Sequence, residues 1–212
     1  MTAKKDLRLQ VVEAARRMNA SGINQGKSGN LSVRTEGGFL VTPTGVPYER
    51  LLPEDLALVH LDGSHAGPRP PSSEWRFHRD IYVTRAEANA VVHCHSPYAT
   101  TLACLRRGIP AFHYEVAFAG AADIACADYA TFGTQALSDS ALAALTGRRA
   151  CLLANHGQIA FGPTLEAAFV LAEKVEALAR MYWQALQIGE PAILDAAEMA
   201  LVLEKFRDYG RH

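Results

Sequence analysis

Apolar residues recur with helical spacing in the longer segments of the chain, and most of these segments end at glycine, proline or polar residues. The spacing predicts helices over 7–18, 74–85, 98–107, 134–145 and 165–188. Gly22 is expected to end the first of them. A last helix is predicted from Asp195, because Glu198 follows three residues later as in a capping box, and a polar tail over 206–212 would follow it.

Shorter apolar runs bounded by turn residues predict strands between these helices. The predicted strands cover 30–33, 39–42, 56–60, 90–97, 109–114, 150–154 and 158–161. Strands and helices intermix without the regular alternation of doubly wound folds. The pattern therefore favours one α/β domain over 1–212, of the αβα type, with a central and mainly antiparallel sheet flanked by helices.

Composition narrows the class of partner. With 212 residues, 49% hydrophobic content and a net charge of -1, the chain is predicted to be globular, with no electrostatic reason to bind nucleic acid or an anionic membrane. No apolar run approaches the roughly 20 residues that a membrane span needs, and the start resembles an amphipathic helix instead of a signal peptide. Small-molecule partners and a cytoplasmic location are expected.

Four cysteines lie far apart without a Cys-x-x-Cys pair, namely Cys94, Cys104, Cys126 and Cys151. We expect them to be reduced core residues. Strand alternation would turn Cys94 away from the face that its two histidine neighbours share.

The candidate chemistry centres on His93 and His95, which would point to the same face of a buried strand. Two such histidines can equally be core residues that bond to backbone carbonyls. His156 favours a metal site, because it stands in a tight Asn-His-Gly turn that can push the ring into a cleft. Three imidazoles with an open position describe a catalytic Zn²⁺ site. The other five histidines are interpreted as surface, packing or tail residues.

Glu74 is the candidate general base, at the predicted start of the second helix. A carboxylate at a helix start is also stabilised by the helix dipole alone. Beside a bound dication, it would ligate the metal and then take a proton once substrate arrives.

A second group of residues is polar but uncharged, and its glycine turns and hydroxyls are suited to cradle a phosphate. Its members are Gly29, Asn30, Thr44, Gly45, Ser72 and Ser73. Lys27 would add charge to the same loop, although a solvated lysine is the simpler interpretation.

Six ordered motifs resemble the class II aldolase/adducin family, most closely its sugar-phosphate aldolase branch, the fuculose-phosphate type. They are SGNLSVR (28–34), LVTPTG (40–45), SSE (72–74), VHCHSPYA (92–99), CADYATFGT (126–134) and LANHG (153–157). The resemblance spans nearly the whole chain and implies the fold of that family.

The resemblance also implies a set of functional residues. It assigns a divalent metal, usually Zn²⁺ with Mn²⁺ or Co²⁺ as alternatives, to the three histidines and Glu74, and it gives Glu74 the acid/base role. It assigns the substrate phosphate to the uncharged group above. Tyr114, reaching the site of a neighbouring subunit in a homotetramer, and Tyr209 in the tail would handle the proton on the C4 oxygen.

The implied reaction is the reversible aldol cleavage of a ketose 1-phosphate to dihydroxyacetone phosphate and an aldehyde. Substrates of the fuculose, 5-deoxyribulose and 5-methylthioribulose type all remain open, because 117–123 departs from the polar, glycine-rich segment expected of a fuculose-phosphate enzyme. A decarboxylase of 3-oxo-sugar-acid phosphates shares the metal residues and is the main alternative. A dehydratase of methylthioribulose phosphate and a 4-epimerase rank lower, as does a non-catalytic, adducin-like interaction module.

Overall fold

Eight strands form one sheet in the computed structural model, which describes residues 2–208. The strands are β1 (Asn30–Thr35), β2 (Gly38–Val41), β3 (Ala57–His60), β4 (His65–Ala66), β5 (Ala90–Cys94), β6 (Cys126–Ala127), β7 (Ala150–Leu153) and β8 (Gly157–Gly162). Their order is β4-β3-β2-β1-β5-β8-β7-β6, and every neighbouring pair is antiparallel except β6 and β7. The predicted, mainly antiparallel sheet is confirmed.

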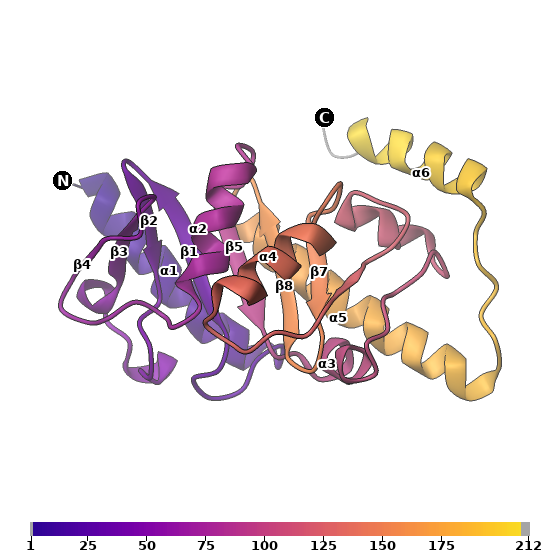
Figure 1. The fold of residues 1–212 in the computed structure, drawn as a ribbon, viewed down its shortest axis with the longest axis horizontal. Coiled ribbons are helices and arrows are strands. Elements are labelled where there is room, and N and C mark those ends of the chain that lie inside the picture. Colours follow the sequence, from indigo (N-terminus) through magenta and orange to yellow (C-terminus); the bar gives the residue numbers. More distant parts are fainter. Residues whose placement is uncertain (1, 209–212) are drawn as a thin grey trace.

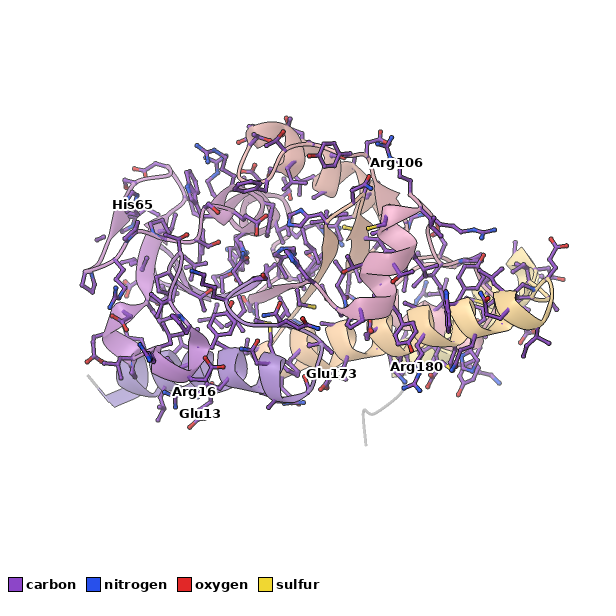
Figure 2. The ribbon with its side chains drawn as sticks, turned by 90° about the horizontal axis from the view of Figure 1, so that it is seen from below. Glu13, Arg16, His65, Arg106, Glu173 and Arg180 are labelled. Carbon is purple, nitrogen blue, oxygen red and sulfur yellow. The ribbon has the colours of Figure 1, made fainter. Side chains whose placement is uncertain are left out.

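Helices cover both faces of this sheet (Figure 1). One face carries α1 (Thr2–Ala20), α3 (Pro97–Cys104) and α5 (Leu165–Ile188), and the other carries α2 (Trp75–Thr84) and α4 (Gln135–Ala144). Three short 3-10 helices lie in the connections, η1 (Tyr48–Arg50), η2 (Pro53–Asp55) and η3 (Tyr114–Ala119). Figure 2 shows α1 and α5 running along one side of the molecule.

Neighbouring strand residues divide between the two cores, as the pleat of a strand requires. On β5, Val92 packs with the α1 and α5 layer, whereas Val91 packs with the α2 and α4 layer. Cys94 belongs to the former, so its side chain points away from the face that His93 occupies, as expected from alternation. Both faces are apolar because both are covered.

The last helix, α6 (Ala196–Asp208), stands apart from these layers at the end of an extended segment (Figure 1). The predicted cap is present, because the Glu198 amide donates to Asp195 Oδ1 at 2.9 Å. The helix continues three residues into the predicted polar tail, because Phe206 packs against Phe118 with ring centroids 4.4 Å apart. Residues 209–212 lie outside the described residues, so the domain boundary of 1–212 stays a prediction.

Two sequence-based expectations are wrong. The predicted strand over 109–114 is a single bridge from Ile109 to Ile124, because Pro110 has no amide hydrogen for a ladder and the chain then turns into η3. Cys104 is exposed at the end of α3, although the other three cysteines are buried or half-buried and all four are free thiols.

In the described part of the chain, no helix combines the length and apolarity that crossing a bilayer requires.

The packing of α5 against the sheet predicts that substitutions at two adjacent residues differ strongly in their effect on stability. Phe169 is 1% exposed and Val170 is 46% exposed. Truncation of Phe169 to alanine is expected to lower the free energy of unfolding by about 3–5 kcal/mol, and Val170→Ala to change it by no more than about 0.5 kcal/mol. Urea unfolding measures both, and equal effects would contradict the assignment of the core-facing side of α5.

Candidate active site and metal centre

Four elements bring the candidate residues to one end of the central strands. His93 is the penultimate residue of β5, and His95 follows the end of that strand. His156 lies in the turn between β7 and β8, and Glu74 is the N-cap residue of α2. Because β5 lies between β1 and β8 in the sheet, these positions converge although the sequence separates them widely.

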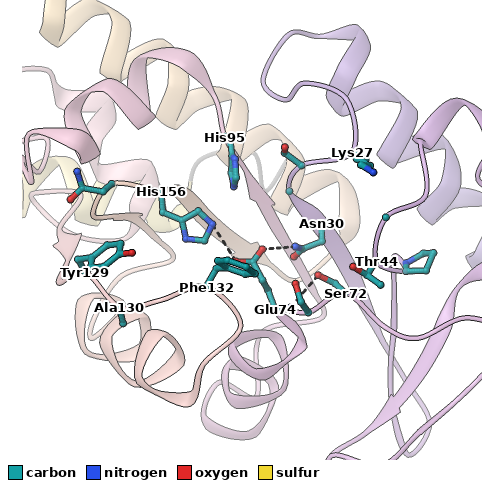
Figure 3. A pocket seen from close by; sticks show the side chains of 16 residues that line it. Lys27, Asn30, Thr44, Ser72, Glu74, His95, Tyr129, Ala130, Phe132 and His156 are labelled. Atoms are coloured by element: carbon teal, nitrogen blue, oxygen red, sulfur yellow. Dashed lines mark hydrogen bonds and ion pairs between the residues drawn. The ribbon is translucent and has the colours of Figure 1, made fainter.

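The three imidazoles surround a common point. Their ring centroids lie 5.0, 4.8 and 4.9 Å apart, and each pair of rings is inclined by 70° to 76°. Their candidate ligand atoms all lie within 4.8 Å of one another. Figure 3 shows the rings of His95 and His156 directed toward the part of the cleft that holds Glu74.

Two glycines permit this close approach. A Cβ on Gly157 would lie 2.5 Å from the Cys94 carbonyl oxygen and 3.0 Å from His95 Cδ2, so a larger residue would displace the backbone between two ligands. Gly29 has a φ of +68°, and a Cβ there would lie 2.6 Å from the His93 carbonyl oxygen. The residue preceding His156, Asn155, holds a φ of +54°, a conformation that asparagine tolerates better than most residues.

The backbone of β8 fixes the orientation of His93. Its Nδ1 lies 2.9 Å from the Gln158 carbonyl oxygen, which only accepts, so Nδ1 carries the hydrogen and Nε2 faces the other rings. Burial lowers the pKa of His95 to about 3, with repulsion from His93 and His156 adding to the effect. His95 is therefore a neutral imidazole, the form that ligates metals.

Glu74 is the charged centre of the site. Its Oε2 lies 3.2 Å from His93 Nε2, and its Oε1 lies 3.2 Å from His156 Nε2. Burial alone would raise the pKa of the carboxyl, but the positive charge on His93 and the contacts from both histidines outweigh it and hold that pKa well below its usual range. Glu74 is therefore ionised although it is only 7% exposed.

This donor set fits a divalent cation. Glu74 Oε1 is buried and has no hydrogen-bond partner among the described residues. His93 Nε2 and His95 Nε2 lie 3.2 Å apart, close to the roughly 3.3 Å expected between two ligands of a tetrahedral Zn²⁺ with metal–nitrogen distances of about 2.0–2.1 Å. An anionic oxygen beside three imidazole nitrogens is also the ligand chemistry that such a metal prefers.

Every residue predicted to hold phosphate lines one cleft beside the histidines, with a volume of about 380 Å³. Two loops form its wall and are held together by backbone hydrogen bonds from Ser72 to the Thr42 carbonyl at 3.0 Å and from Thr44 to the Pro70 carbonyl at 3.3 Å. The turn at Gly45 therefore lies close to the start of α2. Lys27 also lines this cleft.

Asn30 has a role that sequence reasoning did not predict. Its Nδ2 donates to Glu74 Oε2 at 2.9 Å, and its Oδ1 accepts from His78 Nε2. The sequence analysis grouped His78 with the surface, packing and tail histidines, and the structure shows that it is fully buried. Burial, and to a smaller extent the charge on His93, lowers the pKa of His78 to about 3. The i, i+4 spacing of Glu74 and His78 on one helix was the available signal.

Aromatic residues at the mouth of the cleft were also not predicted as site residues. Tyr129 and Phe132 are 55% and 66% exposed, and both line the cleft. Tyr114 does not reach it within this chain: its ring stacks on that of Phe206, 6.2 Å away, beside a separate apolar pocket. Segment 117–123 does not line the cleft either. Tyr209 lies outside the described residues.

The fold and the three-histidine centre are those of an α/β protein with a metal-binding site. The sequence model of the class II aldolase and adducin N-terminal domain family matches residues 9–183, so the chain belongs to that family. Among its relatives, a 5-methylthioribulose-1-phosphate/5-deoxyribulose-1-phosphate aldolase of Rhodospirillum rubrum is 56% identical over 96% of this chain and 92% of its own length. An L-fuculose phosphate aldolase of Escherichia coli is 47% identical, with 95% and 94% covered.

A solved structure agrees with these relationships. An L-fuculose 1-phosphate aldolase superposes with a TM-score of 0.92 at 40% identity, over 95% of this chain and 96% of the other.

Removal of one imidazole is expected to abolish metal binding. At a free metal concentration about 100 times the dissociation constant, binding should stabilise the native protein by about 2.7 kcal/mol. We therefore expect a chelator to lower the melting temperature, added Zn²⁺ to restore it, and His95→Ala to remove both responses. His60→Ala is the control, because His60 lies on β3 and bonds to the Gly37 carbonyl. A wild-type protein that purifies without metal and gains no stability from Zn²⁺ would favour the adducin-like module.

Proposed function

We propose that this protein catalyses the reversible aldol cleavage of a ketose 1-phosphate to dihydroxyacetone phosphate and an aldehyde, with Zn²⁺ as its metal. The observation that carries the proposal is the ionised, buried Glu74 between three imidazoles and a cleft of uncharged donors. The aldolase names of the relatives at 56% and 47% identity support it.

The reaction needs two proton transfers. The C4 hydroxyl loses its proton as the C3–C4 bond breaks, C4 becomes an aldehyde carbon, and the electron pair of the bond passes to C3 and its neighbouring carbonyl. The proton returns at C3 to complete dihydroxyacetone phosphate. A bound dication would supply Lewis-acid stabilisation of the negative charge that develops on the substrate oxygens.

Glu74 is suited to the transfer at C3. Its carboxylate is ionised and faces the cleft at the N-terminus of α2, and Asn30 holds one of its oxygens. The other oxygen, Oε1, lies 3.2 Å from His156 Nε2 without forming a hydrogen bond among the described residues, and so is available to accept a proton. Because its pKa is low, Glu74 retains a proton only after substrate binding changes its surroundings.

The opposite wall of the cleft suits the phosphate. The amides of Gly45 and Ser73 and the hydroxyls of Thr44, Ser72 and Ser73 lie near the start of α2, where the helix dipole favours an anion. Lys27 is the cationic side chain that lines the same cleft. A phosphate held here would place the adjoining carbons of the sugar toward the histidines.

The mouth of the cleft favours an aldehyde with an apolar substituent. Phe132, Tyr129 and Ala130 present apolar surface there, and each methylene that such a wall buries is worth about 0.8 kcal/mol. We therefore place 5-methylthioribulose 1-phosphate and 5-deoxyribulose 1-phosphate before fuculose 1-phosphate as substrates.

We further propose a cytoplasmic homo-oligomer, a tetramer by family resemblance, in which Tyr114 serves the cleft of another subunit. Tyr114 is half exposed and lies outside the cleft of its own chain, as that role requires. With Tyr209, it would handle the proton on the C4 oxygen.

Condensation assays test the reaction and the substrate together. Metal-loaded protein is incubated with dihydroxyacetone phosphate and methylthioacetaldehyde, acetaldehyde or lactaldehyde, and ketose 1-phosphate formation is followed by mass spectrometry. We expect product from all three, with the highest kcat/KM for the methylthio compound. No condensation with any aldehyde, together with carbon dioxide released from a 3-oxo-sugar-acid phosphate, would replace the proposal with the decarboxylase alternative.

Substitution of the proposed base separates proton transfer from binding. Glu74→Gln keeps the shape and an oxygen for Asn30 but removes the basic carboxylate, so we expect metal to remain bound and kcat to fall by about 10²–10⁴-fold. Turnover and metal content of the same preparation are compared. Glu190→Gln, at an exposed position after α5, is the control and should match the wild type. An unchanged kcat in Glu74→Gln would exclude Glu74 as the base.

A further inference from the structure

Strand β1 and helix α2 face each other through two matched rows of polar side chains. On β1 the row is Asn30, Ser32 and Arg34, two residues apart, and on α2 it is Glu74, His78 and Tyr82, four residues apart. Two strand residues span about 6.6 Å and four helix residues about 6 Å. The rows therefore stay in step, and each β1 residue lies against its counterpart on α2.

Hydrogen bonds join these rows into one buried chain. Tyr82 Oη lies 2.8 Å from Ser32 Oγ, and Ser32 Oγ lies 2.7 Å from His78 Nδ1. His78 Nε2 contacts Asn30 Oδ1, and Asn30 Nδ2 reaches Glu74 Oε2 at 2.9 Å. The chain ends at the proposed base and begins in the apolar core, where Tyr82 is 2% exposed.

Each hydrogen bond in this chain has only one permitted direction. The carboxylate of Glu74 only accepts, so Asn30 must present its NH₂ group there and its oxygen to His78. His78 Nε2 must then carry a hydrogen. His78 is packed between Phe39 and Phe77 and touches no carboxylate of the described residues, so the ring is neutral and its Nδ1 accepts from Ser32. Tyr82 consequently donates to Ser32.

We propose that His78 is a positioning residue for Glu74, acting through Asn30. Without the Nε2 hydrogen, the amide of Asn30 could turn over and bring its oxygen against the carboxylate. With the Nε2 hydrogen in place, one N–H of Asn30 donates to Glu74, and the second is left for a ligand in the cleft that Asn30 lines. The catalytic part of this inference rests on the proposed function, whereas the hydrogen-bond directions do not.

Two amide substitutions at residue 78 separate its two contacts. A glutamine places its NH₂ group where His78 Nε2 lies and keeps the bond to Asn30, whereas an asparagine reaches only as far as Nδ1 and keeps the contact with Ser32. We expect His78→Gln to stay within a few-fold of wild-type kcat. We expect His78→Asn to lose about 10- to 100-fold, the usual effect of removing a partner behind a metal-site residue. Equal losses in the two variants would overturn the inference.

A third variant controls for lost stability. Ser138 is fully buried on α4 and donates to Asp80 Oδ2 at 2.6 Å, on α2 but outside the chain of hydrogen bonds. Ser138→Ala should lower the melting temperature, as loss of a buried hydrogen bond does, and leave kcat unchanged. If kcat falls in Ser138→Ala in proportion to its melting temperature, the effect at His78 is one of stability and not of positioning.

The tautomer of His78 is measurable in the wild type without any substrate. Long-range ¹H–¹⁵N correlation spectra of the Zn²⁺-loaded, ¹⁵N-histidine-labelled protein, assigned with His78→Gln, should show a protonated Nε2 and a bare Nδ1. A protonated Nδ1 would overturn the inference. If the wild type cleaves no ketose 1-phosphate, the proposed function fails, and this spectrum still decides how Asn30 is held.

Discussion

The burial of one ionised carboxylate constrains the architecture of this protein. An unpaired charge removed from water costs several kcal/mol, so Glu74 is compatible with folding only where cations and donors meet it. Its partners come from two strands and a turn: His93 from β5, Asn30 from β1, and His156 from the turn before β8. Asn30 pairs directly with His93 in the β1–β5 ladder. A slip of one residue in that ladder would send Asn30 to the opposite face and leave the charge without its donor.

The parts of the fold and the site that could be predicted from the sequence are those that local patterns determine. The histidine pair follows from strand alternation and His156 from turn chemistry, and both are properties of a few consecutive residues. The bounds of α5 follow from sustained helical spacing between Thr164 and Gly189. The predicted strand over 109–114 was wrong for a similarly local reason, because its apolar content outweighed the missing amide hydrogen of Pro110 in our interpretation.

Interactions between distant segments could not be predicted in the same way. His78 looks like any core-facing residue of an amphipathic helix until β1 is placed beside α2, and Asn30 lies 44 residues before Glu74 in the sequence. Phe132 and Tyr129 sit in a segment with almost no regular structure, so no periodicity marks them as cleft residues. Family resemblance alone nominated Tyr114, and a single chain holds it away from the cleft.

The separate position of α6 has a consequence for how the protein can diverge. The family match ends at residue 183, and α6 rests on a small cluster formed by Ala111, Ala117, Met199 and Val202. A helix held by so few apolar contacts opens at a smaller free-energy cost than the paired central strands. Mutations can accumulate there without reaching the register that holds Glu74. Evolution can thus vary α6, apart from the contact with Tyr114 that its proposed role requires, while the metal centre, built into the sheet, keeps its chemistry.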